Sequence, residues 1–180
     1  MATETQAVDY PTTVVGLTPA EQAARTVRLD KLRRNHVLTA MGVGLVPIPI
    51  VDVIGVTGVG VDLIKKLSEE FGDRQYDREK VRSLLTALLA GLLPVAIGGA
   101  VISLLKVVPL IGSTAGAVAM PALFGGAIYA VHNVFVEHYE NGGTILDFDP
   151  VRFKSRFKEE FTNGKVHAAS VAASETKEAA

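Results

Sequence analysis

The feature that most constrains the fold is a pair of long uncharged segments in the second half of the chain. Residues 84–105 and 107–136 contain no Asp, Glu, Lys or Arg, and only Lys106 lies between them. The first segment has about 22 residues, or roughly 33 Å as a helix, close to the ~30 Å hydrocarbon thickness of a bilayer. The second is long enough to return. The pattern predicts an all-α protein built around an apolar helical hairpin of two transmembrane helices, with flanking amphipathic helices.

The rest of the chain divides into regions around this hairpin. Residues 1–17 are polar and predict a flexible leader. Thr18, Pro19 and Glu21 then form a capping box that predicts the start of a helix. We expect a helical membrane-associated domain over residues 18–143, an amphipathic tail helix within residues 144–163 and a disordered tail over residues 164–180.

Prolines predict the turns between these helices. Pro47 and Pro49 interrupt the apolar stretch 37–67, and Asp52 is placed to cap a helix that ends at Gly72. Pro109 lies in the short turn of the hairpin. We therefore expect these three prolines and Asp52 to shape structural turns. Whether residues 37–50 enter the bilayer is left open.

Cationic residues flank the hairpin on both sides. They are Arg74, Arg78, Lys80 and Arg82 before it, and Arg152, Lys154, Arg156 and Lys158 after it. Because cytoplasmic flanks carry an excess of Lys and Arg, both termini are expected in the cytoplasm. The sequence thus predicts a multi-pass protein of a bacterial inner membrane, with a cytoplasmic location as the alternative.

Small residues recur along both apolar segments. The candidates for close helix packing are Gly98, Gly112, Gly116, Ala122 and Gly126. Helices in lipid associate through such residues, because lipid supplies no hydrophobic drive for association. The alternative is that glycine and alanine are simply common in buried helices of any kind.

The expected tail helix carries phenylalanines at Phe153, Phe157 and Phe161, a spacing that places them on one helix face. Around them lie the cations Arg152, Lys154, Arg156 and Lys158. Such a helix can bind an anionic membrane surface or a partner, with its phenylalanines immersed. It can equally pack its phenylalanines on the protein's own helices.

Several function classes are disfavoured by the residues present. There is no cysteine, and the net charge of −1 does not predict nucleic-acid binding. The glycine-rich run 55–60 lacks the Lys and Ser or Thr of a phosphate-binding loop. His132 and His138 are six residues apart, which separates them on a helix, and no nucleophile elbow occurs. We predict no catalytic residue, no cofactor, no metal site and no enzymatic activity.

Three short motifs resemble a known family. They are PIPIVD at residues 47–52, LKVVPLIG at 105–112 and HYENGG at 138–143. In their order along residues 35–143 the chain resembles the bacterial domain-of-unknown-function family 697, which includes YcjF-type inner-membrane proteins. The resemblance implies a membrane setting and an association with a GTPase. Since this chain, unlike fused members, has no GTPase domain, a GTPase would be a separate partner.

The leading hypothesis is a non-enzymatic, membrane-associated helical scaffold or adapter that forms homo-oligomers and works with lipid and a separate GTPase. The first alternative is a soluble or peripheral helical-bundle scaffold that buries its apolar hairpin in an oligomer. The second is a pore-forming or membrane-remodelling assembly, in which Asp52 and Asp62 face water.

A first prediction concerns self-association. Replacing Gly112 or Gly116 with leucine is expected to weaken oligomers in detergent, because a larger side chain keeps helix backbones apart. Size-exclusion chromatography in detergent measures the change. An unaltered oligomer size would contradict the packing role.

Overall fold

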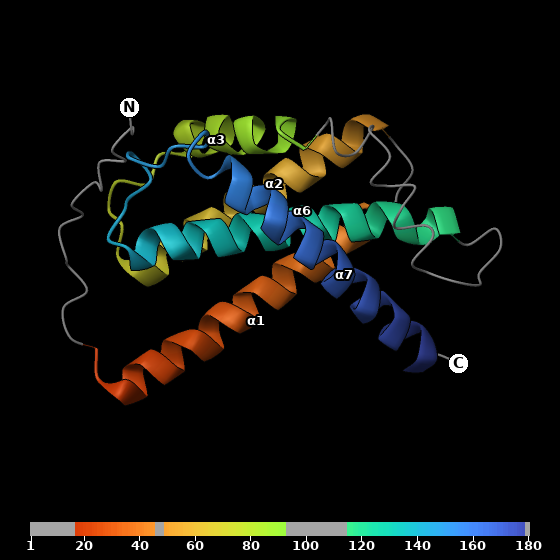
Figure 1. Ribbon diagram of the computed structural model, residues 1–180, viewed down its shortest axis with the longest axis horizontal. Helices are drawn as coiled ribbons and strands as arrows, with labels where there is room; N and C mark the ends of the chain where they lie inside the picture. The colour runs from red at the N-terminus through yellow and green to blue at the C-terminus, as the bar shows by residue number, and fades with distance from the viewer. Residues whose placement is uncertain (1–16, 46–48, 93–114, 179–180) are drawn as a thin grey trace, which may run out of the picture.

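The computed structural model describes residues 17–45, 49–92 and 115–178 (Figure 1). These residues form α1 (Pro19–Val43), α2 (Pro49–Phe71), α3 (Arg78–Ala90), α6 (Ala115–Glu140) and α7 (Lys154–Glu178). Within these ranges no strand occurs, so the predicted all-α class is confirmed. The leader 1–16 lies outside the described residues.

The helix ends follow local sequence signals. The Thr18 hydroxyl accepts a hydrogen bond from the Glu21 amide, and the Glu21 carboxylate accepts from the Thr18 amide at 2.8 Å. Asp77 caps α3 by accepting from the Lys80 amide at 2.9 Å. Gly72 follows α2 with a φ of 72°, which glycine adopts without steric cost. The predicted capping box and the predicted end of α2 are therefore confirmed.

Helix α6 is the centre of the described fold. It contacts α1, α2 and α7, while α3 packs against α2. In Figure 1, α6 runs across the middle of the molecule and α7 crosses it. The inward side chains of α6 are almost fully buried; among the apolar ones are Ile128, Val131, Val134 and Phe135. Because burial of each such side chain contributes about 1.5–3 kcal/mol, α6 supplies much of the drive for folding.

The described residues cover only part of the predicted hairpin. Residues 93–114, with Gly98, Pro109 and Gly112, lie outside the described residues. Among the residues that the structure describes, no helix combines the length and apolar character needed to cross a membrane. The described part of the second apolar segment lies in α6 and faces other helices of this chain, where a lipid-facing span was expected.

Helices α6 and α7 cross closely at glycines. A Cβ added to Gly126 would lie 2.9 Å from the backbone nitrogen of Lys165, and one added to Gly164 would lie 2.8 Å from the carbonyl oxygen of Gly126. Both distances are too short for a real side chain. The packing role predicted for Gly126 is thus seen inside the chain, between two of its own helices.

The tail helix differs from the predicted range at both ends. The helix begins at Lys154, well inside the predicted range 144–163, because the Asp149 carboxylate accepts from the Val151 amide at 2.8 Å and forms a turn there. The helix also continues through Gly164 to Glu178, where disorder was expected. Gly164 serves the contact with α6 and does not end the helix.

The turn before α2 also differs from expectation. Helix α2 begins at Pro49, so Asp52 lies within the first turn of the helix and is not its cap. Proline suits a first helical position, because its missing N–H would have no partner inside the helix. Pro47 lies outside the described residues.

The glycine crossing gives a second prediction. The substitution Gly126→Ala is expected to lower the free energy of unfolding by about 1–3 kcal/mol, because the new methyl group overlaps the backbone of α7. Urea denaturation followed by circular dichroism measures the change. The matched control is Gly58→Ala in α2, where a Cβ meets nothing within 4 Å. The control should be neutral or gain up to about 1 kcal/mol. Equal losses in both variants would contradict the crossing.

Candidate functional site

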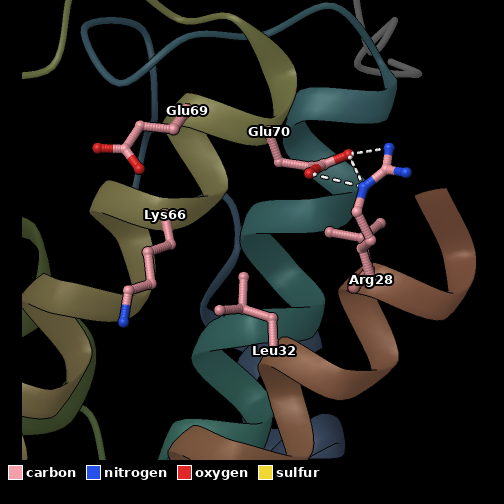
Figure 2. Close-up of a pocket in the computed structure, with 6 residues that line it drawn as sticks. Arg28, Leu32, Lys66, Glu69 and Glu70 are labelled. Carbon is pink, nitrogen blue, oxygen red and sulfur yellow. Dashed lines mark hydrogen bonds and ion pairs between the residues drawn. The ribbon is translucent and has the colours of Figure 1, made fainter.

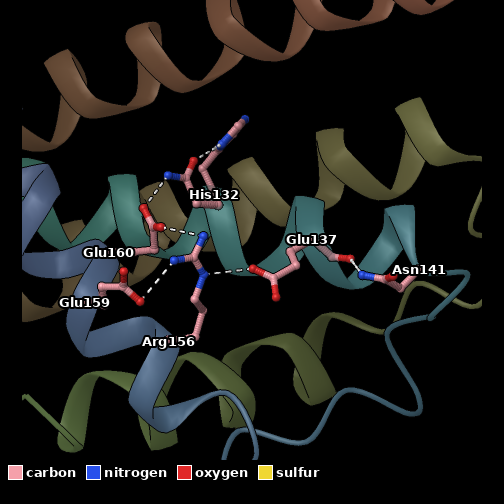
Figure 3. Close-up of polar contacts among 7 residues, drawn as sticks. His132, Glu137, Asn141, Arg156, Glu159 and Glu160 are labelled. Carbon is pink, nitrogen blue, oxygen red and sulfur yellow. Dashed lines mark hydrogen bonds and ion pairs between the residues drawn. The ribbon is translucent and has the colours of Figure 1, made fainter. Parts of the chain in front are cut away.

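Arg156 of α7 forms a polar clamp between α6 and α7 (Figure 3). Its guanidinium donates to Glu137 of α6 at 2.9 Å and to Glu159 at 3.0 Å, and it lies 2.8 Å from a carboxylate oxygen of Glu160. These partners raise the pKa of Arg156, with the hydrogen bond to Glu137 as the largest cause. The clamp satisfies the buried Glu160 carboxylate, which would be costly to leave unpaired.

His132 continues this network into the core. Its side chain is buried, with Nε2 at 3.1 Å from the carbonyl oxygen of Leu29 in α1 and Nδ1 at 3.0 Å from Oδ1 of Asn133. Asn133 in turn donates to Glu160 at 2.6 Å. Both contacts of the ring favour a protonated imidazole, but burial outweighs them and lowers the pKa of His132 to about 4. A neutral ring carries a single N–H, so it donates either from Nε2 to the Leu29 carbonyl or from Nδ1 to the Asn133 side chain.

A second polar contact joins α1 to α2 along an open cleft (Figure 2). The Arg28 guanidinium of α1 donates to both carboxylate oxygens of Glu70, at distances from 2.6 to 3.1 Å. Lys66 and Glu69 line the α2 side, and Leu32 lines the α1 side. The cleft has a volume of about 360 Å³ and mixes both charge signs. This composition is typical of an exposed helix–helix seam.

The connection between α6 and α7 is held by residues distant in sequence. The Asp73 carboxylate accepts from the Ile145 amide at 2.9 Å and from the Tyr139 hydroxyl at 3.2 Å. Phe148 stacks on Phe135 with 4.1 Å between ring centroids. Burial and the Asp73 charge raise the pKa of Tyr139, so its hydroxyl stays protonated as a donor. This connection fixes where α7 begins.

The phenylalanines of the predicted surface helix are mostly inside the protein. Phe157 and Phe161 are 1% and 2% exposed, so the prediction that they form a membrane or partner surface is wrong for both. Phe153 is half-buried and stacks on Phe148 with 4.9 Å between ring centroids. The alternative, packing on the chain's own helices, is the one observed. The physical reason is that α6 offers an apolar face that these rings cover.

The cations of the same segment have separate environments. Arg156 is committed to the clamp, and Arg152 is exposed and lines a cleft with Phe153. Lys154 and Lys158 line a different cleft, of about 320 Å³, between the end of α3 and the start of α7. The other packing candidates, Gly116 and Ala122, both lie in α6, and Ala122 is half-buried.

No metal centre is visible in the described part of the chain, where no three His, Cys, Asp or Glu side chains are grouped to hold an ion. The glycines of run 55–60 lie inside α2 and not in a loop. A Cβ added to Gly60 would lie 3.0 Å from Leu85 of α3, so this glycine serves helix packing.

Comparison with known proteins identifies a relative along nearly the whole chain. Over 173 residues, which are 96% of this chain and 86% of the relative, the sequence is 36% identical to magnetosome membrane protein 22 of Magnetospirillum gryphiswaldense. This chain belongs to the family of that protein. No protein-family model matches the chain, and no solved structure matches it. The resemblance to family 697 therefore stays a prediction.

Prediction from the sequence did not identify some residues that organise this region. Gly164 and Asp73 are examples, because the contact of each is with an element far away in the chain. Asp73 directly follows the glycine that ends α2, which indicates a turn but not a partner 72 residues away at Ile145. A signal was present at Arg156 and Glu160, whose i,i+4 spacing favours an ion pair on a helix.

The burial of His132 gives a third prediction, for the pH dependence of stability. Because the folded pKa is about 4 and the unfolded one about 6.5, the unfolded chain binds the proton more tightly. The contribution of neutral His132 is fully present above about pH 6.5 and is lost as the pH falls toward 4. The loss amounts to about 3 kcal/mol. Urea denaturation at pH 7 and pH 4.5 measures it.

The matched variants are His132→Gln and His167→Gln. The first should lessen the fall in stability between the two pH values, while the second, at an exposed position, should retain most of it. If His132→Gln kept the whole acid loss, or if the native protein gained stability as the pH fell, the neutral state assigned to His132 would be wrong.

Proposed function

We propose that this protein is a membrane-associated, non-catalytic helical scaffold. The observation that carries the proposal is the 36% identity, over 96% of the chain, to a protein named for a magnetosome membrane. At this identity and coverage we propose that the two chains share their general setting. The described helices form the part of the scaffold outside the lipid.

The uncharged sequence supports the same proposal. Between α3 and α6 the chain has Lys106 as its single charged residue, and this stretch is the part that we propose to insert into the bilayer. The surrounding fold is charged: the ion pair Arg28–Glu70 joins α1 to α2, and the pair Arg156–Glu137 joins α7 to the end of α6. A charged bundle joined to an uncharged segment is suited to a membrane surface.

The role as a scaffold, without chemistry, rests on the kind of residues that the bundle positions. Polar groups described above join neighbouring helices: Arg156 of α7 contacts Glu137 of α6, and His132 of α6 contacts the Leu29 carbonyl of α1. We further propose that the protein self-associates and that both termini are cytoplasmic. A separate GTPase partner is proposed from the family resemblance alone.

A second candidate is a peripheral scaffold that keeps its apolar helices inside the protein. The observation that favours it is the burial of α6, whose Val131, Val134 and Phe135 are covered by neighbouring helices. In that arrangement the uncharged stretch would contribute to a core or to an oligomer contact.

A fourth prediction separates the two. When membranes of expressing cells are washed with alkaline carbonate, the protein is expected to stay in the pellet until detergent is added, because an inserted apolar segment resists removal. Immunoblotting of pellet and supernatant measures this. Release by carbonate, or recovery in the supernatant of untreated lysate, would favour the peripheral scaffold and overturn insertion.

A further inference from the structure

A cleft lies between the C-terminal end of α3 and the first turns of α7. Its floor is apolar and includes Leu88 and Phe157, both buried, with Val151 at its rim. Two cations, Lys154 and Lys158, complete the lining. The methylene stem of Lys154 lies over Gly91, with its Cε 4.0 Å from the position that a Cβ on Gly91 would occupy. The absence of a side chain at Gly91 thus leaves room for the cleft.

The two lysines form an uncompensated pair. They are four residues apart on α7, where like charges repel and lower helix stability by a few tenths of a kcal/mol. The lining of the cleft contains neither Asp nor Glu. Among the described residues neither ammonium lies in an ion pair, whereas Arg156, between them in sequence, contacts three carboxylates.

Other clefts on the described surface differ in charge. The α1–α2 cleft is lined by Glu69 and Glu70, the cleft beside His132 by Asp30, Glu137 and Glu140, and the cleft beside Phe153 by Glu137. A carboxylate in the lining would repel an anion. The cleft between α3 and α7, by contrast, combines two cations with an apolar floor and no opposing charge.

From this juxtaposition we infer that the cleft of Lys154 and Lys158 binds the phosphate headgroup of an anionic lipid. Two ammonium groups match a phosphate diester, and Leu88, Val151 and Phe157 match the upper part of an acyl chain. The position of the cleft also suits a lipid site, because α3 leads directly from this cleft into the uncharged stretch that follows Leu92. The inference rests on the proposed membrane association and names the lipid class that the scaffold recognises.

The test, which is our fifth prediction, uses the full chain in neutral detergent micelles. It is titrated with short-chain phosphatidylglycerol and, separately, with phosphatidylcholine of the same chain length, and binding is followed by thermophoresis. We expect tighter binding of phosphatidylglycerol. The double substitution Lys154→Gln with Lys158→Gln should weaken that binding roughly 25-fold, because each lysine near an anionic lipid contributes about fivefold.

Two matched controls distinguish the cleft from overall charge. The double substitution Lys31→Gln with Lys80→Gln removes the same charge from exposed positions on α1 and α3, and should leave binding unchanged. Ala87→Glu places a carboxylate at an exposed position in the cleft lining and should abolish the preference for phosphatidylglycerol. Ser83→Glu, about one turn earlier on α3 and outside the lining, should not.

Each other outcome overturns the inference. Equal binding of the two lipids, or equal losses in both lysine pairs, would mean that the cleft does not select a headgroup. Equally tight binding of inorganic phosphate would make the cleft a site for free phosphate rather than lipid. The two proposals are tested by different measurements. Release by carbonate would contradict membrane insertion, whereas the preference for phosphatidylglycerol is measured in detergent, without a bilayer.

Discussion

The rest of the structure depends on the burial of helix α6. From Ala115 to Val136 this helix has no charged side chain that could be exposed to water. An uncharged helix of this length needs an apolar cover on several sides at once. Here α1, α2 and α7 supply that cover, and the closest approach occurs where Gly126 meets the backbone of α7. The rings of Phe157 and Phe161, which a sequence pattern would place on a surface, are part of the same cover.

Two ion pairs that join different helices lie close to helix ends. Arg156 joins α7 to Glu137 near the end of α6, and Arg28 joins α1 to Glu70 near the end of α2. Such pairs add little net stability when exposed, but an unpaired buried group such as Glu160 would be costly. The ion pairs therefore act mainly on the specificity of helix pairing, while apolar burial supplies the free energy.

The separate roles of ion pairs and apolar burial bear on function. The pairs Arg28–Glu70 and Arg156–Glu137 join neighbouring helices, a structural role in keeping with the scaffold proposed above. The relative, magnetosome membrane protein 22, is named for a membrane, which supports the membrane association proposed above. Within that context Lys154 and Lys158 are cations that the helix pairing does not use, and a lipid headgroup would give them a role.

Much of the helical pattern was determined by the sequence alone. Capping residues Thr18 and Asp77 and the terminating Gly72 act within one turn of their own positions, so their effects can be predicted without knowledge of the fold. The all-α class follows from the same local signals and from the long uncharged segments.

What only the tertiary structure decided is the partner of each face. The sequence shows that Phe157 lies on an apolar face and that Gly126 allows close approach, but both properties suit lipid and protein equally. The prediction that a disordered tail begins at Gly164 was wrong for a similar reason. The small size of Gly164 serves a contact with Gly126, far away in the chain. A periodic pattern records that a face avoids water; which surface replaces the water depends on helices brought together over long separations in sequence.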